Sequence, residues 1–123
     1  MFRSKLFRKI YMKFKGIYTP VVTPYSDNYL YNDEALVETI EFLIKSGVHG
    51  LVIAGSTGEY YAQTMKERID IMGRCKELIK SRLPMIVGTG AIRTEDSIEY
   101  ARQAKNIGAD ALLVTTPPYA YPT

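Results

Sequence analysis

The sequence predicts an α/β protein with about four parallel strands and three helices. Short apolar runs rich in β-branched residues alternate with longer segments of helical periodicity, in units of about 30 residues. In addition, residues 47–54 (GVHGLVIA) resemble residues 108–115 (GADALLVT), and both have the pattern of a helix end, a short turn and a buried strand. Strands that are joined through helices run parallel with right-handed crossovers. An eight-unit barrel and an open doubly wound sheet both fit this pattern.

Each expected element has its own local signal. In chain order they are a strand over 17–22, a helix over 33–46, a strand over 50–54, a helix over 64–81, a strand over 84–87, a helix over 95–107 and a strand over 111–115. Pro20 cannot donate a ladder hydrogen bond, so we expect it at a bulge or on the free side of its strand. Gly47 and Gly108 follow the first and third helices, where glycine commonly ends a helix.

Helix starts are marked by residues that favour N-terminal caps. Asn32 or Asp33 is expected to cap the first helix and Thr94 the third. Thr64 and Glu67 have the spacing of a capping box, in which hydroxyl and carboxylate bond to each other's backbone N–H groups.

The charge of the chain is distributed unevenly. Six of the sixteen basic residues lie in residues 1–15, which hold no acid, and residues 16–123 hold the other ten together with all thirteen acids. The body of the protein is therefore slightly acidic, which argues against nucleic acid as a partner. No apolar run reaches the roughly 20 residues that span a bilayer, so no membrane-spanning segment is expected.

Residues 1–15 are predicted to be a basic tail, separate from a domain over 16–123. Apolar residues recur every four positions from Phe2 to Phe14, so the tail fits a basic amphipathic helix on an anionic membrane or an organelle presequence. The other expectation is a disordered tail, or translation that begins at Met12.

Hydroxyl side chains follow all four expected strands. The carboxyl ends of parallel strands meet at one edge of the sheet, so these groups are expected to surround one site for a small carboxylate or carbonyl compound. The residues are Thr23, Ser56, Thr57, Thr89, Thr115 and Thr116.

Other signals for chemistry are weak. Gly88-Thr89-Gly90 lacks the third glycine of a dinucleotide fingerprint, because Arg93 stands at that position. The single histidine, His49, and the single cysteine, Cys75, are interpreted as structural residues, and no cluster with metal-ligand spacing is present.

Two segments carry a family resemblance. Residues 55–59 (GSTGE) and 116–119 (TPPY), at this spacing, resemble the N-terminal half of the dihydrodipicolinate synthase/N-acetylneuraminate lyase family. The similarity extends over about residues 14–123. It implies that residues 16–123 form the first half of a (β/α)8 TIM barrel, and that the whole protein assembles as a homo-oligomer, a dimer or a tetramer.

The resemblance also implies a reaction. Members of this family are cytoplasmic lyases that bind pyruvate or a related 2-oxo acid as a Schiff base on a lysine, and then form or cleave carbon–carbon bonds or dehydrate sugar acids. Ser56 and Tyr119 match the family's catalytic hydroxyl relay, and Ser56, Thr57 and Gly58 match its carboxylate-binding residues. The resemblance implies no cofactor and no metal.

This chain departs from the family pattern in two ways. The family's Schiff-base lysine lies on the sixth strand and its second relay tyrosine follows the fifth. Neither strand is present in residues 1–123, so the chain by itself is expected to be inactive. The alternatives are a half-barrel that acts only by association with another chain, and a free-standing flavodoxin-like domain. The positions that match the family's lysine-inhibition pocket argue against lysine feedback, because only Asp96 keeps the expected character; they are Tyr60, Ile92, Asp96 and Pro118.

Overall fold

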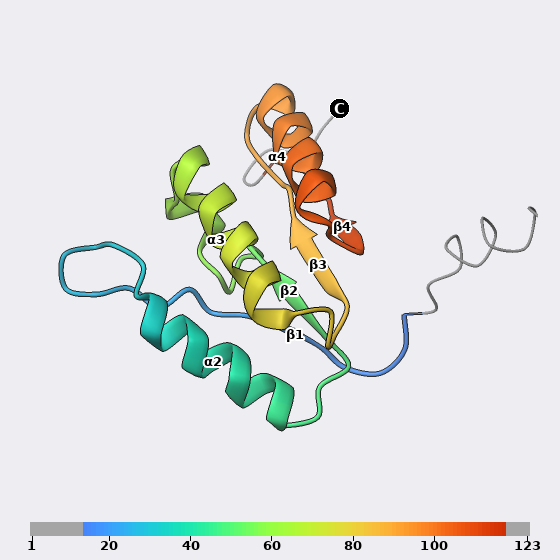
Figure 1. The fold of residues 1–123 in the computed structure, drawn as a ribbon. Coiled ribbons are helices and arrows are strands. Elements are labelled where there is room, and N and C mark those ends of the chain that lie inside the picture. Colours follow the sequence, from blue (N-terminus) through green and yellow to red (C-terminus); the bar gives the residue numbers. More distant parts are fainter. Residues whose placement is uncertain (1–13, 118–123) are drawn as a thin grey trace, which may run out of the picture.

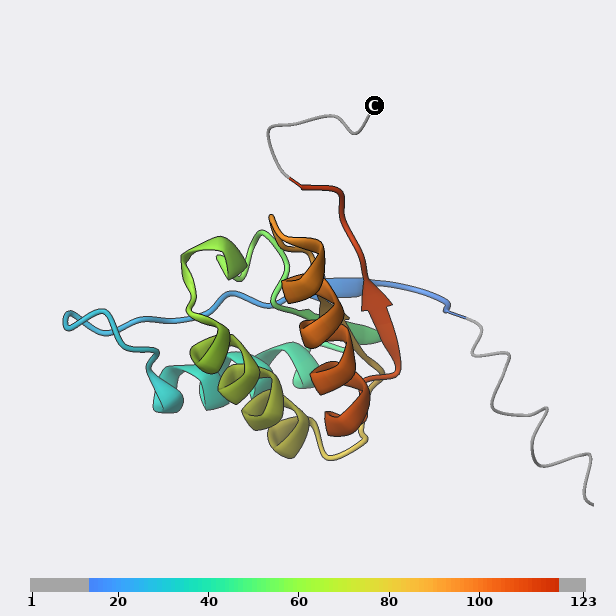
Figure 2. The same ribbon diagram turned by 90° about the horizontal axis from the view of Figure 1, so that it is seen from above.

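The computed structural model describes residues 14–117, which form one four-stranded sheet with helices packed on one of its faces (Figures 1 and 2). Within this range the elements are β1 (Tyr18–Pro20), α2 (Asp33–Lys45), β2 (Gly50–Ile53), the 3-10 helix η1 (Tyr60–Ala62), α3 (Met65–Ile79), β3 (Met85–Gly88), α4 (Thr94–Ile107) and β4 (Ala111–Leu113). All neighbouring strands are parallel.

The strand order decides between the two folds that the sequence allowed. The strands follow one another as β1-β2-β3-β4, without the reversal that a doubly wound sheet requires. The helices cover the same face of the sheet, as the outer helices of a barrel do (Figure 2). The described residues therefore have the architecture of the first half of a (β/α)8 barrel, as the resemblance predicted.

The core lies between the sheet and the helices. From the strands, Leu51, Ile53, Met85 and Val87 point toward the helices and are at most 2% exposed. The helices contribute eight buried apolar side chains, and Val21 and Ala54, just after β1 and β2, complete the core. The helical residues are Leu36, Ile40, Ile71, Met72, Cys75, Ile79, Tyr100 and Ala104. The other face of the sheet, which corresponds to a barrel interior, is more open: Val52 and Ile86 are in register and only partly buried.

Pro20 occupies the free edge of the sheet, which confirms one of its two expected placements. Val21 N donates to Val52 O at 2.9 Å, and Ile17 O accepts from His49 N at 2.8 Å. Alternate residues of a parallel strand bond to the same neighbour, so residues 17 and 21 bond to the segment 49–52 while the backbone N of Pro20 faces away from it. The missing N–H of Pro20 therefore costs no ladder bond.

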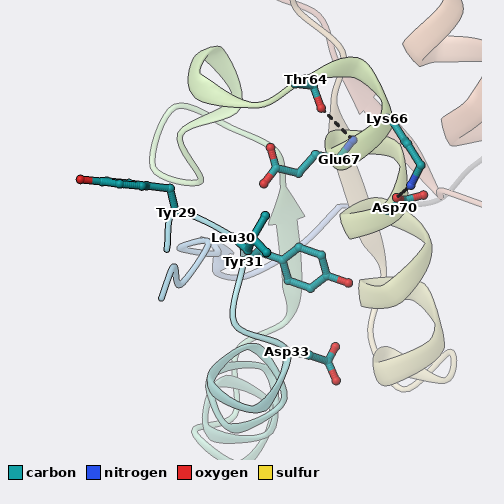
Figure 3. A pocket seen from close by; sticks show the side chains of 8 residues that line it. All are labelled: Tyr29, Leu30, Tyr31, Asp33, Thr64, Lys66, Glu67 and Asp70. Carbon is teal, nitrogen blue, oxygen red and sulfur yellow. Dashed lines mark hydrogen bonds and ion pairs between the residues drawn. The ribbon is translucent and has the colours of Figure 1, made fainter. Parts of the chain in front are cut away.

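The expected caps are confirmed with two corrections. The Asn32 side chain caps α2 by accepting from Ala35 N at 3.1 Å. Thr64 Oγ1 accepts from Glu67 N at 3.2 Å, but no return bond from Glu67 completes a capping box; its carboxylate points into a surface groove instead (Figure 3). Thr94 is already helical, and the extended residue before it, Arg93, is the N-cap and makes no side-chain capping bond.

Cys75 and His49 have the structural roles that the sequence indicated. Cys75 is buried within α3, and burial raises the pKa of its thiol to about 12. His49 Nδ1 accepts from Ile17 N at 2.9 Å, at the end of the sheet opposite the strand tips. Among residues 14–117, no helix is both long enough and apolar enough to cross a bilayer.

Candidate functional site

The segment after β2 forms two overlapping tight turns. Gly58 N donates to Gly55 O and Glu59 N donates to Ser56 O, each at 3.0 Å. Ala54 and Glu59 enter and leave this segment with left-handed φ values of 55° and 56°, a conformation that non-glycine residues rarely adopt. The turns leave Ser56 and Thr57 exposed, and their backbone N–H groups donate to no protein group within the described residues. Such free N–H groups suit an anion.

Gly58 anchors these turns to the rest of the sheet. Its carbonyl accepts from Thr23 Oγ1 at 2.8 Å and from Gln63 Nε2 at 2.9 Å. A Cβ atom at this position would lie 3.0 Å from Val21 O, so glycine allows the close approach of the turn to β1. The hydroxyl of Thr23 therefore ties the turn to the segment that follows β1.

A cavity of about 230 Å³ lies at the carboxyl ends of β2, β3 and β4. This volume suits a small organic acid with a few waters, since one water occupies about 30 Å³. The lining residues are Ala54, Gly55, Ser56, Tyr60, Gly88, Gly90, Leu113, Thr115 and Thr116.

The structure brings some of the predicted hydroxyl groups together and separates others. Ser56, Thr115 and Thr116 line the same cavity. Thr57 lies in the same turn as Ser56 but does not line the cavity. Tyr119 lies outside the described residues, and its role stays a prediction.

Two of the strand-tip threonines do not join the site. Thr23 is buried and bonds to Gly58 O, and Thr89 is fully buried with its hydroxyl unpaired. The expected convergence of all strand-tip hydroxyls was thus wrong for these two, because alternate residues along a strand point to opposite faces of the sheet.

The glycines of Gly88-Thr89-Gly90 serve close packing between strands. A Cβ at Gly88 would lie 2.8 Å from the carbonyl carbon of Ala54 and closer still to its oxygen. A Cβ at Gly90 would collide with the hydroxyl of Thr115. Gly88 therefore needs to be glycine, because its close contacts are backbone atoms, whereas at Gly90 the Thr115 side chain would have to move.

Arg68 is the functional candidate that the sequence analysis missed. It projects from α3, is 1% exposed, and donates to Gly90 O at 2.9 Å and to Gly88 O at 2.5 Å. Burial lowers the pKa of its guanidinium. A signal was available: Arg68 lies three and four residues before Ile71 and Met72, on the apolar face of the helix.

A second cavity of about 200 Å³ borders the first and shares Tyr60 and Gly90 with it. Three of the four positions that match the family's lysine-inhibition pocket line it together with Arg68; they are Tyr60, Ile92 and Asp96. Pro118 lies outside the described residues.

A groove of about 570 Å³, larger than the strand-end cavity, lies elsewhere on the surface (Figure 3). It separates the loop before α2, with Tyr29 and Leu30, from the first turns of α3, where Lys66 and Asp70 form an ion pair. No strand tip borders it, so its size alone does not make it the site.

No lysine of residues 14–117 lines the strand-end cavity. Lys15 precedes β1, and the others lie in helices or, for Lys80, at a helix end; these are Lys45, Lys66, Lys76 and Lys105. The described residues also hold no group of three or more histidine, cysteine or acidic side chains placed to bind a metal ion.

Comparison with known proteins gives one consistent result. The 4-hydroxy-tetrahydrodipicolinate synthase of Methanoculleus marisnigri is 40% identical over 111 residues, which are 89% of this chain and 38% of the relative. YagE, a prophage protein of the dihydrodipicolinic acid synthase family from E. coli K12 solved with pyruvate, superposes with a TM-score of 0.87 at 32% identity, over 90% of this chain and 37% of that one.

The dihydrodipicolinate synthase from Acinetobacter baumannii, also solved with pyruvate, superposes with a TM-score of 0.85 at 34% identity, over 89% of this chain and 38% of that one. The chain thus spans little more than a third of the length of its relatives. The profile of the Dihydrodipicolinate synthetase family matches residues 13–123. The chain belongs to the dihydrodipicolinate synthetase family and corresponds to its N-terminal part.

Proposed function

We propose that this chain is the carboxylate-binding part of a lyase that acts on pyruvate or a related 2-oxo acid through a Schiff base. The observation that carries the proposal is the cavity at the strand ends, which Ser56 lines beside the free N–H groups of the turn. The two similar structures named above contain pyruvate, which supports a ligand of this chemistry.

The roles of the residues follow from the turn. The N–H groups and hydroxyls of Ser56 and Thr57 would hold the carboxylate, and Gly58 would keep the turn closed against β1. In addition, the Ser56 hydroxyl would pass protons between the reacting atoms and Tyr119, which another subunit of a homo-oligomer would contribute.

The covalent step needs a group from outside this chain. Schiff-base formation joins a neutral amine to the ligand carbonyl and releases one water, and the amine needs a lowered pKa in a dry pocket. None of the described lysines lies at the cavity. The remaining strands of a barrel would supply both the lysine and the closure against water.

Borohydride trapping with pyruvate tests the proposal. We expect no reduced adduct, by intact mass, on this 123-residue chain, and an adduct on the other half when a C-terminal half of a family member is supplied. Ser56→Ala should slow trapping in the complemented barrel. An adduct on this chain alone, or complemented trapping that is indifferent to Ser56→Ala, would contradict the assignment.

A second function, association without catalysis, is favoured by one observation. Leu112, Leu113 and Val114 are 41%, 43% and 67% exposed beside the free edge of β4. Exposed apolar side chains at an unpaired strand edge promote pairing with another chain. Sedimentation velocity separates the two functions: a stable complex that never traps pyruvate, even with a complementing half, supports the second.

A further inference from the structure

Arg68 hydrogen-bonds, from the helix side of the sheet, to two glycines that line the strand-end cavity; we call the segment Gly88–Gly90 the wall of this cavity. Its two terminal nitrogens donate to the carbonyl groups of Gly88 and Gly90, at 2.5 and 2.9 Å, and both glycines line that cavity. These carbonyl groups are therefore directed to the helix side of the sheet. Their partial negative charges do not face a ligand in the cavity.

The charge of Arg68 has no acidic partner within the described residues. Its guanidinium lies over the rings of Tyr60 and Tyr100, 4.7 and 4.0 Å from their centroids, and its Nε makes no hydrogen bond. Cation–π contacts and two carbonyl groups offset only part of the cost of burying a cation. An apolar side chain would fill this space at lower cost, so packing alone does not explain an arginine.

We infer that Arg68 is a positioning residue for the 2-oxo-acid site, an inference that rests on the function proposed above. It keeps the backbone from Gly88 to Gly90 in place, and its positive charge, which has no acidic partner among the described residues, lies directly behind two glycines of the cavity that Ser56 also lines. The charge acts over a short path of protein with little intervening water, where electrostatic attraction is stronger than in bulk solvent. Arg68 thereby favours a carboxylate over a neutral ligand.

The test uses the full chain labelled with ¹⁵N and three variants. Arg68→Met removes the charge, and Arg68→Lys keeps the charge but loses the two-pronged donor. Arg74→Met is the matched control, because Arg74 lies on the same helix but pairs with the half-buried Asp33, away from the strand-end cavity.

Two measurements distinguish the role of Arg68 in positioning the backbone from the effect of its charge on binding. The first is the rate of hydrogen exchange of the Thr89 amide, which donates to Leu113 O at 3.0 Å between β3 and β4. The reference is the Val21 amide, which donates to Val52 O at the β1 edge of the sheet. The second is the affinity for pyruvate and for the neutral pyruvamide, followed through the Ser56 amide shift.

We expect Arg68→Met to speed Thr89 exchange and to weaken pyruvate binding roughly tenfold, with little effect on pyruvamide. Arg68→Lys should also speed Thr89 exchange but should bind pyruvate within about threefold of the unaltered chain. Arg74→Met should change neither measurement. Because Arg68→Lys keeps the charge inside the fold, it gives a result even if Arg68→Met fails to fold.

The possible failures are distinct. If pyruvate binds the unaltered chain and Arg68→Met equally well, the inference is overturned and the proposed function stands. Equal losses for pyruvate and pyruvamide would also overturn it, since they indicate a purely structural role. If pyruvate does not shift the Ser56 amide signal in the folded, unaltered chain, the proposed pocket is wrong. The Thr89 exchange rate then decides by itself whether Arg68 positions the backbone from Gly88 to Gly90. An exchange rate that is unchanged in Arg68→Met would overturn this positioning role as well.

Discussion

The contact between Gly88 and Ala54 gives the sharpest stability prediction, because it joins two central strands at the cavity wall. In Gly88→Ala, the new Cβ would lie 2.8 Å from the Ala54 carbonyl carbon, closer to its oxygen, and 3.3 Å from Gly55 N. All three atoms are backbone, so no rotamer change relieves the clash. The strands must separate by roughly 1 Å, an overpacking that costs about 2–3 kcal/mol.

Gly73→Ala is the matched control, since it makes the same chemical change in the middle of α3. A Cβ at Gly73 would meet nothing within 4 Å. Alanine should therefore stabilise the helix by about 0.5–1 kcal/mol through its higher helix propensity. The two variants should differ by roughly 3 kcal/mol, which is about a hundredfold in the unfolding equilibrium.

Urea unfolding followed by circular dichroism measures both variants against the unaltered chain. Gly88→Ala should move the unfolding midpoint to a lower urea concentration without changing the slope of the unfolding free energy against urea. Gly73→Ala should move the midpoint to a higher urea concentration. The reasoning would be refuted if Gly88→Ala were as stable as the unaltered chain, or if the two variants lost stability equally. Either result would mean that the close approach of β2 and β3 does not limit the side chain at residue 88.

Three further predictions concern the helices. Asn32→Ala should destabilise the chain by about 1 kcal/mol, because it removes a capping bond, while Arg93→Ala should be nearly neutral, since that cap has no side-chain bond; thermal melts compare them. Cys75 should resist a disulfide reagent in the native state at pH 8 and react on unfolding, because a pKa of about 12 leaves roughly a thousandfold less thiolate than an ordinary cysteine has. Hydrogen bonding from Arg74 lowers the pKa of Asp33, so this pair stabilises the fold above the ordinary carboxyl pKa, and the effect is lost as pH falls through the lowered value. Asp33→Asn should lower the melting temperature slightly at pH 7 and by progressively less as the pH falls below the ordinary carboxyl pKa; an equal loss at every pH would contradict the assignment.

Much of the fold could be predicted from local sequence. The apolar runs, the alternating helical segments and the caps Asn32 and Thr64 are short-range features, and the structure places elements within a few residues of their expected limits. Three of the four strands are shorter than expected, and β3 keeps its predicted length but begins one residue later. β1, for example, covers only Tyr18–Pro20 of the predicted 17–22, because a parallel strand extends only as far as its neighbour pairs with it.

The arrangement of the site was decided by the tertiary structure. Local sequence placed a hydroxyl after each strand, but only the pairing of β2, β3 and β4 shows that Ser56 and Thr115 line one cavity while Thr89 points away from it. The close approach at Gly88 likewise depends on where Ala54 lies across the sheet.

The α/β class, the pair of hydroxyls after the second strand and the family resemblance were all predictable from the sequence, because each depends on residues that are neighbours along the chain. Only the tertiary structure placed Arg68, with its buried charge on the carbonyl groups of Gly88 and Gly90. Those groups lie 20 and 22 positions away in sequence, and they meet only when α3 packs against the sheet. Burial and charge pairing are properties of that packing, and no periodicity within the helix encodes the partner.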